Sequence, residues 1–154
     1  MADVSQGSAQ PADVERVDWG RLPVAAVAAA AAAAVACALL FALESAVGII
    51  DSSVSLPSMI GTGPVSIASV AVAAAVYSVL AAIAFAVIGL IGRRPIRVFW
   101  IVSVVALLLS LALPFTVPGP PPGMRVGLAL MHVATWAATV GILTTLARRS
   151  SSVP

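Results

Sequence analysis

One histidine, His132, lies inside a long apolar segment of the 154-residue chain. An ionisable side chain is costly to bury among apolar residues, so it is a candidate functional group. As a proton relay, a ligand contact or a metal ligand, the imidazole would take part in chemistry. As a structural group, it would donate one interhelical hydrogen bond and accept another. The sequence leaves both interpretations open.

Hydroxyl-bearing and small residues recur at helical spacing in three apolar segments, one of which contains His132. The three sets are His132, Thr135 and Thr139; Ser103, Ala106, Ser110 and Pro114; and Ser66, Ser69, Ala73 and Tyr77. Residues three or four positions apart share one face of a helix, so we predict that these stripes face one another. Antiparallel helices would bring Ser110 and His132 to one layer. The simpler interpretation is that each hydroxyl bonds a carbonyl of its own helix.

Glu44 and Asp51 follow the first apolar segment, on the side of the expected bundle where His132 and Arg125 are nearest. A pair between Glu44 and either of these residues would be stronger beside lipid than in water. The alternative is a solvated carboxylate at a helix end. We therefore predict a candidate polar layer within the apolar segments, formed by His132, Ser110, Thr135 and Glu44.

Other patterns that carry chemistry are missing from the sequence. Cys37 is the one cysteine, which rules out an internal disulfide and argues against a cysteine-based metal site. Ser110 is not part of a G-x-S-x-G motif, and no acid is placed to orient His132, so a hydrolase has weak support. A single histidine also argues against bis-histidine haem ligation within one chain. We expect no catalytic residue, no cofactor, no metal and no enzyme activity.

The composition identifies an integral membrane protein. Hydrophobic residues make up 61% of the chain and charged residues 9%, whereas about 25% is usual for charged residues in soluble domains. The mean hydropathy is +1.12. The eight basic residues are all arginines and flank the apolar segments, so they indicate membrane topology and we expect no nucleic-acid binding.

Four apolar segments are long enough to cross a bilayer, because about 20 helical residues span roughly 30 Å. We predict the spans at about 24–43, 64–91, 98–114 and 126–147, within one transmembrane domain at 21–149. The segments 1–20 and 150–154 are predicted cytoplasmic tails, the first of them disordered. The first span is rich in alanine, which permits close helix packing, and we expect it in the interior of the bundle.

The connections contain turn-forming residues. We predict that 44–63 is an outer loop with an interfacial or half-inserted piece, and that 61–64 is a turn with Pro64 in the first turn of the next helix. Pro114 should end or kink the third helix. The Pro-Gly-Pro-Pro-Pro-Gly run at 118–123 should form a stiff loop that no helix enters.

The arginines set the expected orientation. An inside N-terminus places seven arginines on the cytoplasmic side and only Arg125 on the outer side. The residues that determine this topology are Arg21, Arg93, Arg94, Arg97, Arg148 and Arg149. We therefore predict an all-α membrane protein, a four-transmembrane-helix up-down bundle with the N-terminus and the C-terminus inside.

The second half of the chain carries a family resemblance. The run RVFWIVSVVALLLSLAL at 97–113 is followed by Pro114, and the last span opens with GLALMHVA at 127–134. The positions that carry the resemblance are Phe99, Trp100, Ser110, Leu111, Pro114, Met131 and His132. The sequence resembles an uncharacterised actinobacterial family of four-span integral membrane proteins, a domain of unknown function. The resemblance implies a fold and a membrane location but no activity, substrate or cofactor.

Three classes of function compete on this evidence. The first is a structural, accessory or interaction protein of the bacterial plasma membrane, in contact with lipid and packed against a second copy or another membrane protein. The second is a small transporter or channel subunit whose polar pathway includes His132, Ser110, Thr135 and Glu44. The third, a membrane enzyme that acts on a lipid-like substrate, lacks the residues for catalysis.

Overall fold

The computed structural model describes residues 16–51, 53–58 and 61–148. Most of the two predicted tails, together with Arg149, lies outside these residues. The elements are α1 (Leu22–Ala46), β1 (Ser55–Ser58), β2 (Gly61–Pro64), α2 (Ile67–Ile91), α3 (Pro95–Thr116) and α4 (Pro122–Leu146). Each of the four helices is long and apolar enough to cross a membrane. The all-α fold with four candidate membrane helices is therefore confirmed.

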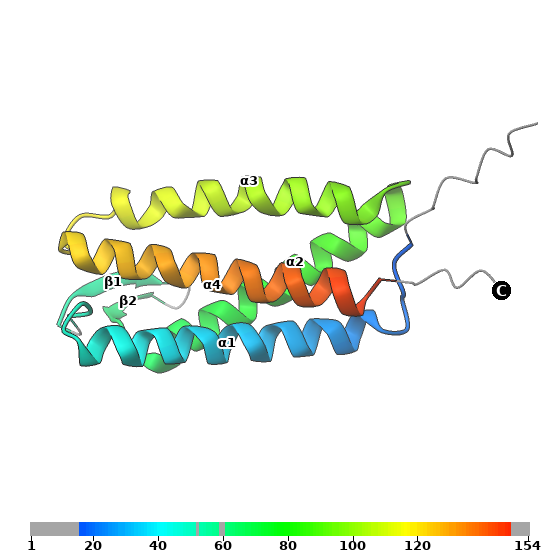
Figure 1. Ribbon diagram of the computed structural model, residues 1–154. Helices are drawn as coiled ribbons and strands as arrows, with labels where there is room; N and C mark the ends of the chain where they lie inside the picture. Colours follow the sequence, from blue (N-terminus) through cyan, green and yellow to red (C-terminus); the bar gives the residue numbers. More distant parts are fainter. Residues whose placement is uncertain (1–15, 52, 59–60, 149–154) are drawn as a thin grey trace, which may run out of the picture.

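Successive helices run in opposite directions along the long axis of the molecule (Figure 1). The start of α1 and the end of α4 consequently meet at one end. There the backbone amide of Asp18 donates to the carbonyl of Ala147 at 2.8 Å, and Val17 forms an isolated β-bridge with Arg148. We call this the arginine end, and the opposite end, with β1 and β2, the hairpin end.

Helix α1 packs through one narrow face of small residues. Ala25, Ala29, Ala33 and Cys37 recur every four positions and are buried against α2 and α4, because small side chains let helix backbones approach closely. The opposite face stays exposed, with Leu39 at 67%. The prediction of an interior helix is therefore wrong, since only one side of α1 is enclosed. An apolar outer surface is instead what a lipid environment favours.

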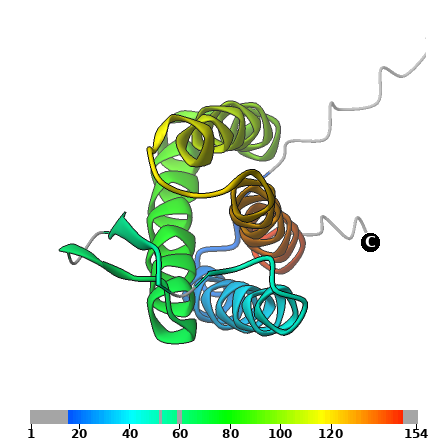
Figure 2. The same cartoon turned by 90° about the vertical axis from the view of Figure 1, so that its left-hand side faces the viewer.

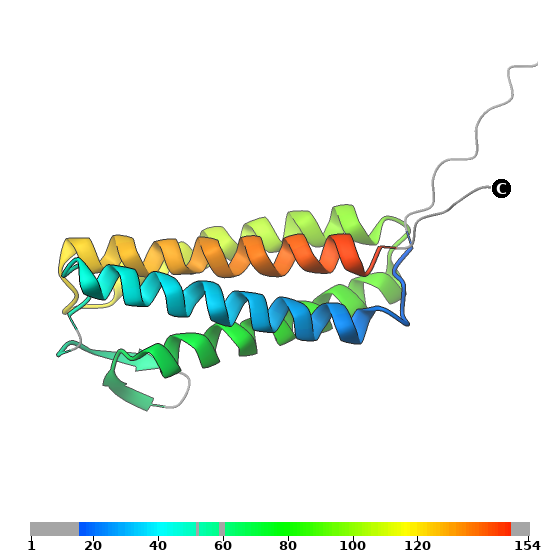
Figure 3. The ribbon, with the colours of Figure 1, turned by 60° about the horizontal axis from the view of Figure 1, so that its bottom comes forward.

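Helix α2 crosses the bundle diagonally. It begins beside α1 at the hairpin end and approaches α3 at the arginine end (Figures 2 and 3). At the arginine end the rings of Phe85 and Phe99 pack with their centroids 4.7 Å apart. Helix α3 also contacts α4, where the rings of Trp100 and Trp136 meet edge to face at 5.5 Å. The diagonal course separates α2 from α3 toward the hairpin end.

The segment between α1 and α2 differs from the predicted loop. Strands β1 and β2 form a two-stranded antiparallel hairpin in which Ser55 pairs with Pro64 and Ser58 with Gly61. The predicted turn at 61–64 is therefore a strand, and Pro64 lies outside the helix. Helix α2 begins only at Ile67, because Ser66 and Ser69 form a reciprocal capping box that satisfies free amide groups of the first turn.

Prolines also occupy positions that the sequence analysis assigned differently. Pro114 lies inside α3, which continues to Thr116. Pro122 and Gly123 belong to α4, and Pro122 is its first residue. Proline is accepted there because the first amide groups of a helix have no intrahelical partner. Similarly, Pro95 opens α3, so the connection after α2 is shorter than predicted.

Candidate functional site

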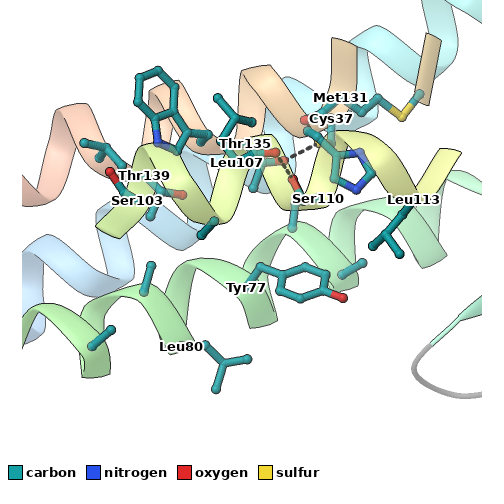
Figure 4. Close-up of a pocket in the computed structure, with 18 of the residues that line it drawn as sticks. Cys37, Tyr77, Leu80, Ser103, Leu107, Ser110, Leu113, Met131, Thr135 and Thr139 are labelled. Atoms are coloured by element: carbon teal, nitrogen blue, oxygen red, sulfur yellow. Dashed lines mark hydrogen bonds between the residues drawn. The ribbon is translucent and has the colours of Figure 1, made fainter. Parts of the chain in front are cut away.

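A cavity of about 470 Å³ lies between α2, α3 and α4, and Cys37 of α1 contributes to its lining. The predicted polar stripes largely converge on it (Figure 4). The stripe residues in the lining are Ala73 and Tyr77 of α2, Ser103, Ala106 and Ser110 of α3, and His132, Thr135 and Thr139 of α4. Ser66 and Ser69 are not part of it, because they cap α2. The cavity is therefore the candidate site.

The cavity opens sideways, between the diverging α2 and α3. Tyr77 of α2 is 52% exposed and Leu113 of α3 is 55% exposed, and both belong to the lining. Leu80 is an exposed lining residue further along α2. Since these residues lie within candidate membrane spans, the mouth would face lipid rather than water.

Most hydroxyl groups of the lining are already used within the helices. Ser103 donates to the carbonyl of Trp100 at 2.9 Å, and Ser110 donates to that of Leu107 at 2.8 Å. Thr139 shares a hydrogen bond of 2.7 Å with Ser78, which joins α4 to α2. The wall of the cavity is consequently more apolar in character than its residue types suggest.

The sequence analysis missed two polar residues here: Cys37, which lines the cavity, and Ser78, which lies outside the lining and bonds the lining residue Thr139. Cys37 lies 3.0 Å from the hydroxyl of Thr135, within hydrogen-bond distance for a sulfur, and joins α1 to α4. Its thiol also donates to the carbonyl of Met131 at 3.6 Å. Ser78 is fully buried and also donates to the carbonyl of Ala74 at 2.8 Å. The four-residue spacing that Cys37 shares with the buried alanines of α1 was the available signal.

His132 lines the cavity but does not link two helices. Its Nδ1 lies 2.7 Å from the carbonyl oxygen of Leu128 in its own helix. Since a carbonyl only accepts, Nδ1 is the donor of this hydrogen bond. Within residues 16–51, 53–58 and 61–148, Nε2 has no hydrogen-bond partner. Of the two interpretations left open by the sequence, the interhelical hydrogen bond does not form among these residues, and Nε2 is the ring nitrogen left to a ligand.

Glu44 does not join the cavity. Its side chain is 4% exposed at the contact between α1 and α4, and neither carboxyl oxygen has a hydrogen-bond partner among the described residues. Neither expected pair forms. Arg125 donates to the carbonyls of Pro120 and Phe115 at 2.9 and 3.0 Å, and His132 bonds the carbonyl of Leu128. The structure thus brings His132, Ser110 and Thr135 together and places Glu44 elsewhere.

The arginines divide between the two ends of the bundle. Arg21, Arg93, Arg94, Arg97 and Arg148 lie near the start of α1, between α2 and α3, or after α4, which is the arginine end. Arg125 lies near the start of α4 at the hairpin end. In the described part of the chain, no group of three or more His, Cys, Asp and Glu side chains lies together as a metal site would require.

The fold and the cavity define the chain as a small four-helix membrane protein with a lateral apolar cavity. Over residues 17–152 the sequence matches the family of unknown function DUF6069, and the protein belongs to that family. No curated protein and no solved structure matches the chain. The resemblance to an uncharacterised domain family is thereby confirmed, while an actinobacterial source stays a prediction.

Proposed function

We propose that this protein is an accessory protein of the bacterial plasma membrane that binds the hydrocarbon chain of a lipid in its lateral cavity. The observation that carries the proposal is the apolar cavity itself, which opens between α2 and α3 at the depth of the helices. A small-molecule site is usually a cavity of about 300–1,000 Å³ lined by apolar side chains with few polar groups. The cavity of about 470 Å³ falls within that range.

The size of the cavity favours a lipid chain over a partner helix. A helix about 10 Å wide that rises 1.5 Å per residue occupies roughly 120 Å³ per residue. A cavity of about 470 Å³ would hold only about one turn of such a helix. A hydrocarbon chain is thinner and can enter sideways from the bilayer, past the exposed side chains of Tyr77 and Leu113.

The polar groups support binding rather than catalysis. Ser110 donates to Leu107 and His132 donates to Leu128, so the serine and the histidine do not form an activated pair. Tyr77 and His132 each lie about 15 Å along their helices from the hairpin end, so the two polar side chains lie at a similar depth in the cavity. The Nε2 atom of His132 is the ring nitrogen left to form a hydrogen bond with a polar group near the bound chain.

We also propose that both termini lie in the cytoplasm, and the distribution of arginines supports this orientation. Cytoplasmic loops of membrane proteins are enriched in basic residues. The arginine end carries Arg93 and Arg94, whereas the hairpin end carries Arg125, whose guanidinium is bonded to backbone carbonyls. The outer apolar faces leave room for a second copy or another membrane protein as a further partner.

Native mass spectrometry of the full-length protein in a mild detergent tests the lipid site. We expect one lipid adduct per chain on the wild type, and about tenfold less adduct on Ala106→Phe. Ala106 lines the cavity, so the larger ring would occupy the space of the lipid chain. Ala112→Phe is the matched control, because Ala112 is an exposed residue of the same helix outside the lining.

The two variants should melt at similar temperatures, which separates loss of the site from loss of the fold. A wild-type protein without an adduct would contradict the proposal. The same would follow if Ala106→Phe and Ala112→Phe retained as much lipid as the wild type.

A further inference from the structure

Glu44 is a buried carboxyl group that the lipid site does not use. It lies in the last turn of α1 and is 4% exposed. A Cβ atom built on Gly127 of α4 would lie 2.5 Å from Oε2 and 2.9 Å from Cδ of Glu44. The carboxyl therefore fills the space that the missing side chain of Gly127 leaves, and the two helices meet closely at this point.

Nothing around Glu44 compensates a negative charge. Both carboxyl oxygens are buried and lack a hydrogen-bond partner among the described residues. An ionised carboxylate without a partner in apolar surroundings is far more costly than a neutral acid. The carbonyl end of a helix also disfavours an anion, and Glu44 lies in that last turn of α1. Helix α4 begins at the same end, but Gly127 is its sixth residue, and the effect of a helix N-terminus falls off within the first turn. Burial without a partner is therefore the main cost of a charge at Glu44.

The titratable groups on the elements near Glu44 do not neutralise it. On α1, Cys37 lies seven residues earlier and is engaged with Thr135. On α4, Arg125 bonds the carbonyls of Pro120 and Phe115, and His132 bonds that of Leu128.

Helix α2 offers only Tyr77, which lines the cavity. After α1, Asp51 accepts hydrogen bonds from the hydroxyl and the amide of Ser53, which lower the pKa of its own carboxyl. No cation thus faces Glu44 within the described ranges.

We propose that Glu44 is a proton-binding site: the packed bundle holds its carboxyl in the protonated form, and loss of that proton separates α1 from α4 at the hairpin end. The ligand is a proton, which is exchanged with water at that end. Deprotonation leaves a charge against Gly127, and the carboxylate gains hydration only when the two helices part. The site is independent of lipid binding, because Glu44 does not line the cavity.

Infrared spectroscopy of the full-length protein in liposomes tests the protonation directly. A protonated carboxylic acid has a carbonyl stretch apart from the amide bands. We expect this band in the wild type at a pH at which an exposed glutamate is already ionised, because charging a buried carboxyl without a partner is costly. The band should be absent from Glu44→Gln and present in Asp51→Asn, which removes an exposed carboxyl. Absence of the band from the wild type, or its persistence in Glu44→Gln, would overturn the proposal.

Thermal unfolding tests the coupling to helix packing. The folded state would hold a proton that the unfolded chain releases, so stability should fall as the pH rises above the ordinary range of glutamate. We expect the melting temperature of the wild type to decrease by several degrees from about pH 5.5 to about pH 8.5. Glu44→Gln keeps the neutral shape and should lose this slope. An equal slope in both proteins would contradict the coupling.

Discussion

The hydroxyl groups of Ser78 and Thr139 form a buried hydrogen bond of 2.7 Å between α2 and α4. Hydrogen bonds between membrane helices contribute about 0.6 kcal/mol on average and about 1.7 kcal/mol at most. Because both groups are buried, loss of one leaves the other without its interhelical partner. This pair is therefore the residue-scale contact whose contribution can be measured most cleanly.

A double-mutant cycle with Ser78→Ala and Thr139→Val should give a coupling free energy of about 0.6–1.7 kcal/mol. The measurement is the free energy of unfolding in mixed micelles. Thr145→Val serves as the control, since Thr145 is exposed and its hydroxyl bonds only carbonyls of its own helix. A coupling indistinguishable from zero would show that the contact does not hold α2 against α4.

Helical periodicity was enough to predict that His132 and Thr135 share one face of their helix and that this face meets the face with Ser110. It could not place Glu44, since burial of that carboxyl depends on Gly127, a residue distant in sequence. The sequence also could not predict which group bonds Nδ1 of His132. The same residue types are expected whether the partner is a carbonyl of the same helix or a group on another helix.

At the scale of elements, hydropathy predicted four helices because each must be apolar over a full bilayer thickness. The hairpin was missed because serine, proline and glycine are weak strand formers, so β1 and β2 read as a loop. The diagonal course of α2 could not be predicted from the sequence either, because the tilt of a helix is set by its packing against neighbouring helices. That tilt creates the cavity.

The close approach of α1 and α4 predicts a cost for a larger residue at Gly127. Gly127→Ala would place a methyl group 2.5 Å from Oε2 of Glu44, so we expect a loss of about 1–3 kcal/mol in the free energy of unfolding. Gly141→Ala, on the same helix, meets no atom within 4 Å and should be neutral or stabilising, because alanine favours helix. Equal effects of the two substitutions in mixed micelles would argue against tight packing at Gly127.

At the scale of the whole molecule, apolar side chains cover the outer faces of all four helices, whereas the arginines lie near the ends. This arrangement matches a bilayer, which solvates apolar side chains along the spans and charged groups at both surfaces. The sequence predicted it from the four long apolar segments and the arginines that flank them. The proposed orientation, with the arginine end in the cytoplasm, is inferred from the excess of arginines at that end. This orientation can be tested directly.

Reporter fusions in a bacterial host should report both termini in the cytoplasm. A green fluorescent protein fused after the full chain should fluoresce, because it folds on the cytoplasmic side. Alkaline phosphatase fused after residue 118, at the hairpin end, should be active, because it requires export. The opposite result in both fusions would reverse the orientation that the excess of arginines predicts.

The most direct measurement of lipid binding is photocrosslinking in liposomes that contain a phospholipid with a photoreactive group in its acyl chain. Peptide mapping by mass spectrometry then locates the labelled residues. We expect the label to concentrate on cavity residues such as Tyr77, Leu107 and His132, and to fall in Ala106→Phe but not in Ala112→Phe. Label spread evenly over outer residues such as Leu39 and Leu90, with no change in Ala106→Phe, would contradict a lipid site in the cavity.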